Sequence, residues 1–286
     1  MTGTLSTQAL DAPMITLREL SAGYGAAPIL ADLSLDLRAG SMIGLIGPNG
    51  AGKTTLLKLL MGLMRPLSGE ALVQVRPVAA YRRAALARRM TLVPQDTQIG
   101  FAFAVEDIVA MGRNPHLGRF RVPGAHDLEM VRRAMAETGV TRFARRLIDT
   151  LSGGERQRVI IARAIAQETP IVLLDEVTAN LDLCHQLEVL GLAQKLARDG
   201  RLVVAAIHDL AMASRFCDRL LLLAEGGLRA DGTPDSVLTE GNLRRYFHVE
   251  ARIDRLRDGS GLSIEPLAPL PAAAGDGSSQ PEGVSQ

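Results

Sequence analysis

The chain of 286 residues has few cysteines, few aromatic residues and no excess of charge of either sign. Its two cysteines, Cys184 and Cys217, stand apart in the sequence, which argues against a disulfide scaffold and for a reducing compartment. A net charge of +1 excludes a molecule that binds polyanions over its whole surface. The five histidines are scattered, so the sequence shows no metal-ligand cluster.

Long hydrophobic runs are absent as well. No segment approaches about 18 consecutive apolar residues, so we expect no membrane span. The opening residues 1–13 lack the basic and apolar parts of a secretory signal, so we expect a cytosolic protein. Lysine is scarce beside arginine and occurs at Lys53, Lys58 and Lys195.

Lys53 stands in the segment around which the rest of the chain is arranged. Residues 41–64 read as a short apolar strand, a glycine-rich turn and an amphipathic helix, and residues 47–54 fit G-x-x-x-x-G-K-[ST]. Without Cβ atoms, the glycines let the backbone bend round an anion with its N–H groups pointing inward, at the positive end of the following helix. Lys53 adds a compact charge for the β- and γ-phosphates, and the Thr54 hydroxyl can bind Mg²⁺. The sequence therefore predicts a nucleotide site.

Two further stretches carry groups suited to phosphate chemistry. Residues 152–154, Ser-Gly-Gly, open a helix and form a second anion-ready N-terminus, although Ser-Gly is also an ordinary helix cap. The apolar run Ile171–Leu174 is typical of a central parallel strand and ends in Asp175 and Glu176. At the carboxyl end of such a strand, Asp175 suits a Mg²⁺ shell and Glu176 suits the base that orients water. The alternative for both residues is a solvated pair at a strand end.

Two single residues stay open from their sequence context alone. Tyr24 lies in a glycine-rich turn, where it either packs on the surface or stacks on a purine. His208 follows the apolar strand Leu202–Ile207, a place where a lone histidine is usually only hydrogen-bonded.

The pattern of elements predicts one elaborated α/β domain over residues 14–265. Helical stretches dominate from about residue 96 to 163, which we interpret as a helical subdomain inserted into the core. Residues 1–13 are expected to form a flexible tail. Residues 266–286 are of low complexity and are expected to be disordered.

Taken together, the motifs resemble the ATP-binding subunit of an ABC transporter, from about Met14 to Leu262. The matching segments are Gly47–Thr54 for the Walker A loop, Gln95 for the Q-loop, Leu151–Gln157 for the signature, Leu173–Glu176 for the Walker B strand end, Asn180–Asp182 for the D-loop and His208 for the H-loop. Tyr24 falls where that family places its adenine-stacking aromatic residue.

The resemblance implies a fold, two cofactors and a shared site. The fold is α/β, a P-loop NTPase core with a mixed, largely parallel sheet, an N-terminal antiparallel β part and a helical insertion. Two copies pack head to tail, so that ATP lies between the Walker A loop of one copy and the signature of the other. ATP closes this dimer, and hydrolysis reopens it.

The same resemblance assigns roles to individual residues. The catalytic residues are Glu176, His208 and Gln95, and the Mg²⁺ ligands are Thr54, Gln95 and Asp175. The residues expected to bind ATP are Tyr24, Gly47, Pro48, Asn49, Gly50, Ala51, Gly52, Lys53, Thr54, Thr55, Ser152, Gly153, Gly154 and Asp182.

Within that family, residues 101–118 look most like subunits that serve importers of iron chelates, haem and vitamin B12, although Asn114 stands where an aromatic residue is frequent. The expected cargo is a ferric siderophore or haem, with vitamin B12 as the alternative. The expected partners are an integral membrane permease, a second copy of this chain and, indirectly, a substrate-binding protein, at the cytoplasmic face of the membrane. Phe101, Phe103, Val105 and Met111 can offer the permease an apolar docking surface, and a role in the helical core is an equal alternative for some of them.

Two departures from the family pattern are Glu155, where glutamine is most frequent, and Val177, where proline is usual. Without the fixed φ of proline, the turn that holds Glu176 is expected to be looser. The rival interpretation is a soluble ABC-type ATPase that acts on DNA or ribosomes. Such proteins usually carry two cassettes or long coiled-coil insertions, and this chain shows neither. A P-loop kinase or GTPase would not need the signature, and a purely regulatory module would be expected to lack Glu176.

Overall fold

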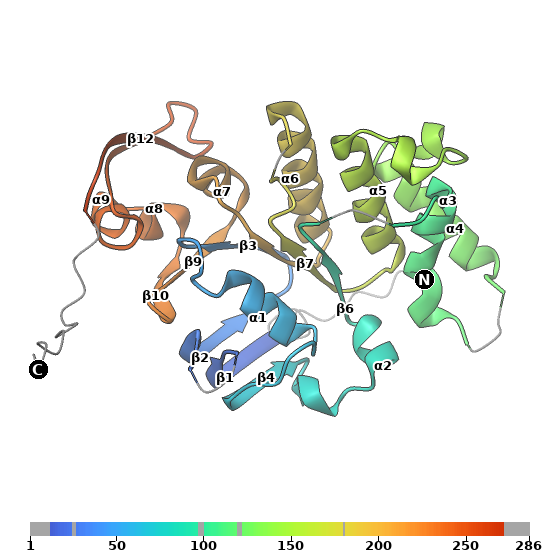
Figure 1. Ribbon diagram of the computed structural model, residues 1–286, viewed down its shortest axis with the longest axis horizontal. Coiled ribbons are helices and arrows are strands. Elements are labelled where there is room, and N and C mark those ends of the chain that lie inside the picture. Colours follow the sequence, from blue (N-terminus) through green and yellow to red (C-terminus); the bar gives the residue numbers. More distant parts are fainter. Residues whose placement is uncertain (1–11, 25–26, 97–99, 119–121, 180, 272–286) are drawn as a thin grey trace, which may run out of the picture.

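A central sheet organises the molecule, and the described residues of this computed structural model, 12–24, 27–96, 100–118, 122–179 and 181–271, place six strands in it (Figure 1). In spatial order the strands are β10 (Gly227–Gly232), β9 (Arg219–Ala224), β3 (Ser41–Ile46), β8 (Leu202–Ala206), β7 (Ile171–Asp175) and β6 (Met90–Val93). Neighbours from β9 to β6 run parallel, and β10 pairs antiparallel with β9. The carboxyl ends of the parallel strands therefore meet at one edge of the sheet.

Side chains alternate along the central strands between two separate cores. In β7, Ile171 and Leu173 belong to one core, whereas Val172 and Leu174 belong to the other. The neighbouring strand β8 alternates in the same way. Because these strands are covered on both faces, their sequences are apolar throughout instead of alternating with polar residues.

The first core lies between the central sheet and an antiparallel sheet. That second sheet has the order β2 (Leu30–Leu37), β1 (Ile15–Ala22), β4 (Ser68–Val73) and β5 (Arg76–Pro77). Helix α1 (Lys53–Leu60) contacts both β1 and β7, and its leucines are buried in this core (Figure 1). The short helices η2 (Val78–Ala80) and α2 (Arg83–Ala87) lead from β5 to β6.

The second core is covered by helices on the opposite face. Between β6 and β7 the chain forms α3 (Val105–Ala110), η3 (Met111–His116), α4 (Ala125–Glu137), η4 (Thr141–Phe143), η5 (Ile148–Thr150) and α5 (Gly153–Ala166), the green and yellow group in Figure 1. Helices α6 (Leu183–Arg198) and α7 (Leu210–Phe216) pack against the same core. The predicted α/β class, with its largely parallel sheet, N-terminal antiparallel part and helical insertion, is confirmed.

The two cysteines lie in opposite surroundings. Cys217 packs against β3 at Gly44, where an added Cβ would stand 2.9 Å from the Cys217 Sγ. Burial raises the pKa of the Cys217 thiol to about 12. Cys184 is exposed on the first turn of α6.

After β10 the chain forms α8 (Pro234–Val237), α9 (Glu240–Asn242), the π-helical turn η6 (Leu243–Phe247) and a hairpin of β11 (Val249–Arg255) and β12 (Leu262–Pro269). The expectation of disorder from residue 266 is therefore wrong as far as Pro269, which still pairs with Val249. The hairpin is fixed to α7, because the backbone N–H of Leu262 donates to Ser214 Oγ at 2.9 Å. The other predicted domain boundaries stay predictions. No helix in the described part of the chain is both long and apolar enough to cross a membrane.

Candidate nucleotide-binding site

The glycine-rich loop joins β3 to α1 and has room for glycine alone at two positions. Gly47 has φ 147°, and an added Cβ would lie 2.0 Å from the carbonyl oxygen of Leu223. Gly52 caps α1 with φ 93°, and a Cβ there would stand 2.5 Å from Leu30 Cδ2. The loop backbone thus curls round the start of α1, where helix N–H groups and the positive end of the helix dipole favour an anion.

Lys53 is the cation of this loop. It is only 4% exposed, and its Nζ donates to the carbonyl oxygens of Gly47 at 2.8 Å and Pro48 at 3.1 Å. Burial lowers the pKa of Lys53, while the negative charges of Glu176 and Asp175 oppose that shift. A buried ammonium at the start of a helix is well suited to the charge of a bound phosphate.

Thr54 of the glycine-rich loop and Asp175 at the end of β7 bring two oxygen ligands close together. Thr54 Oγ1 donates to Asp175 Oδ1 at 3.0 Å, although the residues are 121 positions apart. Burial raises the pKa of Asp175, and the bond from Thr54 opposes this shift. A hydroxyl and a carboxylate beside a phosphate loop match the oxygen ligands that Mg²⁺ takes in nucleotide sites, so the residues fit that ion.

Glu176 and His208 form the second polar pair at this sheet edge. Glu176 directly follows β7, His208 follows β8, and the Glu176 Oε1 lies 2.6 Å from the His208 Nε2. The Glu176 side chain is 14% exposed, so it is largely withdrawn from bulk solvent. Gln95 is exposed just after β6, and β6 pairs in parallel with β7, so Gln95 lies at the same edge.

Tyr24 follows β1 and is 62% exposed. Its turn lies beside the phosphate loop, because the space next to Gly52 is filled by Leu30 and Ile29 at the start of β2. An exposed ring at this place is free to stack on a base, and the role predicted for Tyr24 stays a prediction.

The signature begins α5 on the other side of the central sheet. Ser152 Oγ accepts from the Glu155 backbone N–H at 3.3 Å, and the Ser152 N–H donates to Glu155 Oε2 at 2.9 Å, which is a capping box. Glutamate in place of glutamine thus serves the cap, and the bond from the Ser152 backbone lowers the pKa of Glu155. Ser152 and Gly153 are exposed.

Within one chain, the N-termini of α1 and α5, the two helix ends suited to binding phosphate, do not lie together. Helix α1 contacts β1 and β7 in the first core, whereas α5 contacts α3, α4 and β6 around the second core. Ser152, which is exposed, and Lys53 of the same chain therefore start helices on different faces of the central sheet.

Asp182 caps α6, and its Oδ1 lies 2.7 Å from His185 Nδ1. Its predicted neighbour Asn180 lies outside the described residues. Sequence reasoning did not single out His185, and its only signal there is its place three residues after the capping Asp182.

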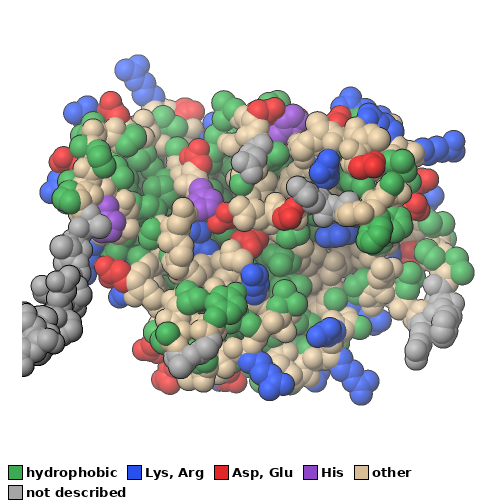
Figure 2. Space-filling model, viewed as in Figure 1, with side chains coloured by type: hydrophobic (Ala, Val, Ile, Leu, Met, Phe, Trp, Pro, Cys, Tyr) green, Lys and Arg blue, Asp and Glu red, His purple; other side chains and the backbone are tan. Residues whose placement is uncertain are grey.

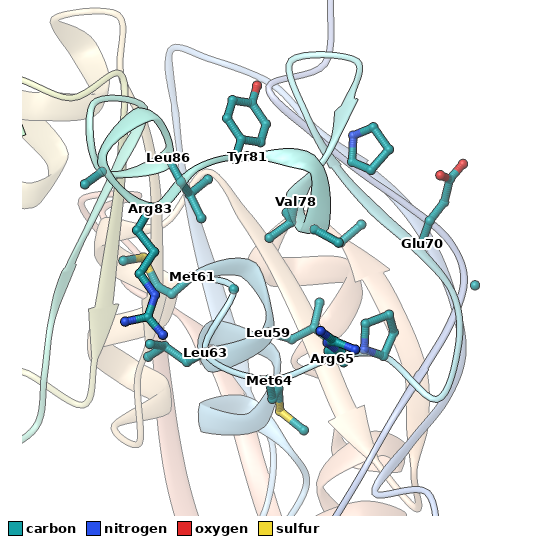
Figure 3. A pocket seen from close by; sticks show the side chains of 17 residues that line it. Leu59, Met61, Leu63, Met64, Arg65, Glu70, Val78, Tyr81, Arg83 and Leu86 are labelled. Atoms are coloured by element: carbon teal, nitrogen blue, oxygen red, sulfur yellow. The ribbon is translucent and has the colours of Figure 1, made fainter.

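A separate pocket of about 760 Å³ opens at the opposite end of α1 (Figure 3). Its lining is mostly apolar and includes Leu59, Leu63, Val78 and Leu86. None of the predicted site residues lines it, so it is not the nucleotide site. Figure 2 shows acidic and basic side chains interspersed on the face it presents, without a broad basic area.

Known proteins resemble the chain over most of its length. Residues 30–179 match the family model described as ABC transporter. A cobalamin import ATP-binding protein of Halobacterium salinarum is 45% identical over 249 residues, which cover 87% of this chain and 62% of that protein. A hemin import ATP-binding protein of Thermobifida fusca is 44% identical over 236 residues, which cover 82% of each chain.

Among solved structures, one described as an inward-facing, metal-chelate type ABC transporter superposes with a TM-score of 0.78 and 33% identity, covering 90% of this chain and 98% of that chain. The chain thus spans less than two thirds of the cobalamin relative, at 62%, and most of the hemin relative, at 82%.

Proposed function

Since this chain belongs to the ABC transporter family, we propose that it is an ATP-hydrolysing subunit that powers the import of a metal chelate through a membrane permease. The observation that carries the proposal is the polar cluster at the carboxyl edge of the sheet. There, Lys53, Thr54 and Asp175 lie where a phosphate and its metal ion would bind, and Glu176 Oε1 lies 2.6 Å from His208 Nε2 beside them.

In this proposal the loop 47–54 binds the β- and γ-phosphates through backbone N–H groups and Lys53. Glu176 accepts a proton from the attacking water, a role that suits a withdrawn carboxylate one residue after Asp175. His208 holds the Glu176 carboxylate in place, and Tyr24 stacks on the adenine.

Mg²⁺ would be held by Thr54 Oγ1 and Asp175, with Gln95 completing the protein ligands. The ion, when bound, offsets the negative charge of the β- and γ-phosphates. The 3.0 Å separation of Thr54 Oγ1 and Asp175 Oδ1 supports this assignment, because one ion can contact two oxygens that lie so close together.

A head-to-tail dimer explains the second anion-ready helix start. Because the exposed Ser152 and the Lys53 of its own chain start helices on different faces of the sheet, we assign Ser152 to the partner's γ-phosphate. Each site would then combine one copy's residues 47–54 with Ser152, Gly153 and Gly154 of the other copy.

The permease would dock on the segment that follows Gln95. Phe101 is 73% exposed, Phe103 39% and Met111 37%, and the two phenylalanine rings meet edge to face at 6.2 Å. Val105 is fully buried at the start of α3, so of the two alternatives it takes the core role. The proposed docking surface therefore consists of Phe101, Phe103 and Met111.

Ferric siderophore or haem is the cargo that the relatives favour, since one is a hemin importer subunit and the similar solved structure is of metal-chelate type. Cobalamin is the second candidate, because a 45% identical relative is a cobalamin import protein. A substrate-binding protein outside the membrane would deliver either cargo.

A deletion strain tests the cargo. We expect it to lose growth on a ferric siderophore or on haem as sole iron source, and to regain growth with inorganic iron. A plasmid copy with Glu129→Gln, an exposed change, should complement the deletion, whereas Glu176→Gln should not. Undiminished uptake of siderophore and haem, together with lost uptake of cobalamin, would select the second candidate.

Unimpaired uptake of all three chelates would overturn the cargo proposal. Co-purification then separates a transporter subunit from a soluble ABC-type ATPase. A membrane protein retained on the tagged chain supports the first, and ribosomes or nucleic acid retained on it would support the second.

A further inference from the structure

The first turns of α5 and α6 touch at one point, where the His185 ring lies against Gly154. A Cβ added to Gly154 would stand 2.8 Å from the His185 Cδ2, 2.9 Å from its Cγ and 3.1 Å from its Nε2. Gly154 is helical, with no positive φ, so its backbone would accept an alanine. The space for a side chain at position 154 is occupied by the imidazole.

The other side of the same ring is fixed by the D-loop. His185 Nδ1 lies 2.7 Å from Asp182 Oδ1, and the His185 backbone N–H donates to that oxygen at 2.9 Å. These two bonds lower the pKa of Asp182 and hold its carboxylate at the N-terminus of α6. His185 therefore stands between the signature and the D-loop and touches both.

Further contacts extend this connection to Glu176. Gln186 Nε2 donates to the carbonyl oxygens of Leu181 at 3.0 Å and Thr178 at 3.4 Å. The loop then turns back through a bond of 3.0 Å from the Ala179 N–H to the Glu176 carbonyl oxygen. The connection from Gly154 to the backbone of Glu176 thus runs through His185, its chain neighbour Gln186 and the turn at residues 176–179.

An ion pair on the following turns supports the same two helices. Arg158 Nη1 of α5 lies 2.8 Å from Glu188 Oε2 of α6, and the Arg158 side chain is only 16% exposed. The pair keeps α5 and α6 in register, so the contact at Gly154 is not an isolated touch.

We propose that His185 is a positioning residue that fixes the signature of each chain to the loop holding its own Glu176. The proposal rests on the proposed function and on its head-to-tail dimer. In that dimer the signature serves the partner's ATP, whereas Glu176 serves the ATP of its own chain. When the signature of one chain binds the partner's ATP, His185 would bring Glu176 of that same chain into position at its own ATP. The two ATP sites of the dimer would therefore become active together.

Two substitutions of His185 test separately its contact with Asp182 and its contact with Gly154. His185→Asn keeps a donor near the Nδ1 position for Asp182 and empties the space beside Gly154. His185→Phe keeps a ring beside Gly154 and removes the bond to Asp182. His126→Asn is the control, since His126 is exposed and pairs with Glu168 at the other end of α5.

We expect both His185 variants to lower kcat by about 10- to 100-fold, the size of a misplaced reacting group. The affinity of the monomer for ATP should change by less than about twofold, since Lys53 and its loop are untouched, and the melting temperature should stay near that of the control. A merely structural histidine would lower the melting temperature and leave kcat per folded molecule unchanged.

The double variant gives the sharper test. Gly154→Ala alone should abolish most of the ATPase activity, because its methyl group pushes on the imidazole. Gly154→Ala with His185→Asn should be at least about tenfold more active than the product of the two single effects. Purely multiplicative losses, or wild-type kcat in both His185 variants, would overturn the proposal. A wild-type protein without any ATPase activity would instead refute the proposed function.

Discussion

Glu176 adopts a backbone conformation that few side chains accept. Its φ of 50° lies in the left-handed region, which costs about 1 kcal/mol or more for a residue other than glycine. Neighbours hold it there: Val177 is 4% exposed in the second core, and the Ala179 N–H donates to the Glu176 carbonyl oxygen at 3.0 Å. The turn expected to be loose without proline is thus held by a buried valine.

The position of this carboxylate leads to the first prediction. Glu176→Gln keeps the shape of the side chain and removes its basicity, so ATP hydrolysis should fall by about a hundredfold or more while ATP binding persists. Steady-state ATPase rates and equilibrium binding measure the two effects separately. Turnover near the wild-type rate would show that Glu176 is not the base.

Val75 shows the same kind of strain without a visible function. It has φ 64° in the turn between β4 and β5, is β-branched and is 84% exposed. Glycine accepts this conformation, so Val75→Gly should raise the free energy of unfolding by about 1 kcal/mol. Gly40→Ala is the opposite change, because Gly40 has φ 77° and open space around it, and it should cost about 1 kcal/mol. Thermal melts of both variants check the signs, and equal signs would contradict this account.

At the level of elements, the C-terminal end of α5 is held by the segment that follows α3. Arg113 Nη1 donates to the Ala166 carbonyl oxygen at 2.7 Å and lies 3.1 Å from Glu168 Oε2, while its Nε lies 2.9 Å from Asp127 Oδ1. His116 Nε2 lies 2.8 Å from the Gln167 carbonyl oxygen. The positive charge of Arg113 at this end complements the helix dipole, so α5 is held at the end opposite its signature.

The contacts of Arg113 with the C-terminal end of α5 can be tested by substitution, because the loss of a buried partner has a large effect on stability. Arg113→Ala should lower the free energy of unfolding by about 3 kcal/mol, since it leaves a carboxylate and a carbonyl without their partner. Arg132→Ala, which removes an exposed pair with Glu129, should cost less than about 1 kcal/mol. Denaturant titrations of the two variants make the comparison, and similar losses would rule out the capping role.

The sequence predicts those elements whose pattern is local. The strand Ile171–Leu174 and the helix opened by Ser152 follow from an apolar run and a cap, and both are observed. The hairpin of β11 and β12 was missed because prolines and low complexity conceal strands that are decided by their pairing. For Val105 the sequence leaves surface and core open, because periodicity does not say which neighbour covers a helix, and the structure buries it.

Some contacts of the site can likewise be predicted from the sequence, and others cannot. Lys53, Thr54 and Asp175 can be placed together from sequence, because the edge of a parallel sheet collects the residues that follow its strands. The contacts of His208 with Glu176 and of His185 with Gly154 depend on how distant segments pack. No local pattern contains that information.

For the whole molecule, the central fact is that Lys53 and Ser152 start helices on opposite faces of the central sheet. In a homodimer, Lys53→Ala and Ser152→Ala should each disable both composite sites. When the two variants are mixed in one dimer, one site is intact and the other is doubly damaged. We expect this mixed dimer to bind one ATP, as counted by equilibrium dialysis. Two equal sites, or a monomer that hydrolyses ATP at the full rate, would contradict the shared site.

The contrast between the two cysteines has a practical consequence. With its pKa raised to about 12 and its sulfur packed on Gly44, Cys217 should resist a maleimide at neutral pH, whereas the exposed Cys184 should react. Mass spectrometry should count one label per native chain and two after denaturation.

Because Cys184 adjoins the D-loop, a spin label there would form a pair across the dimer. ATP added to the Glu176→Gln variant should shorten the interspin distance measured by pulsed electron paramagnetic resonance. The closure of the dimer could thereby be measured as a distance between native cysteines, without an engineered attachment site.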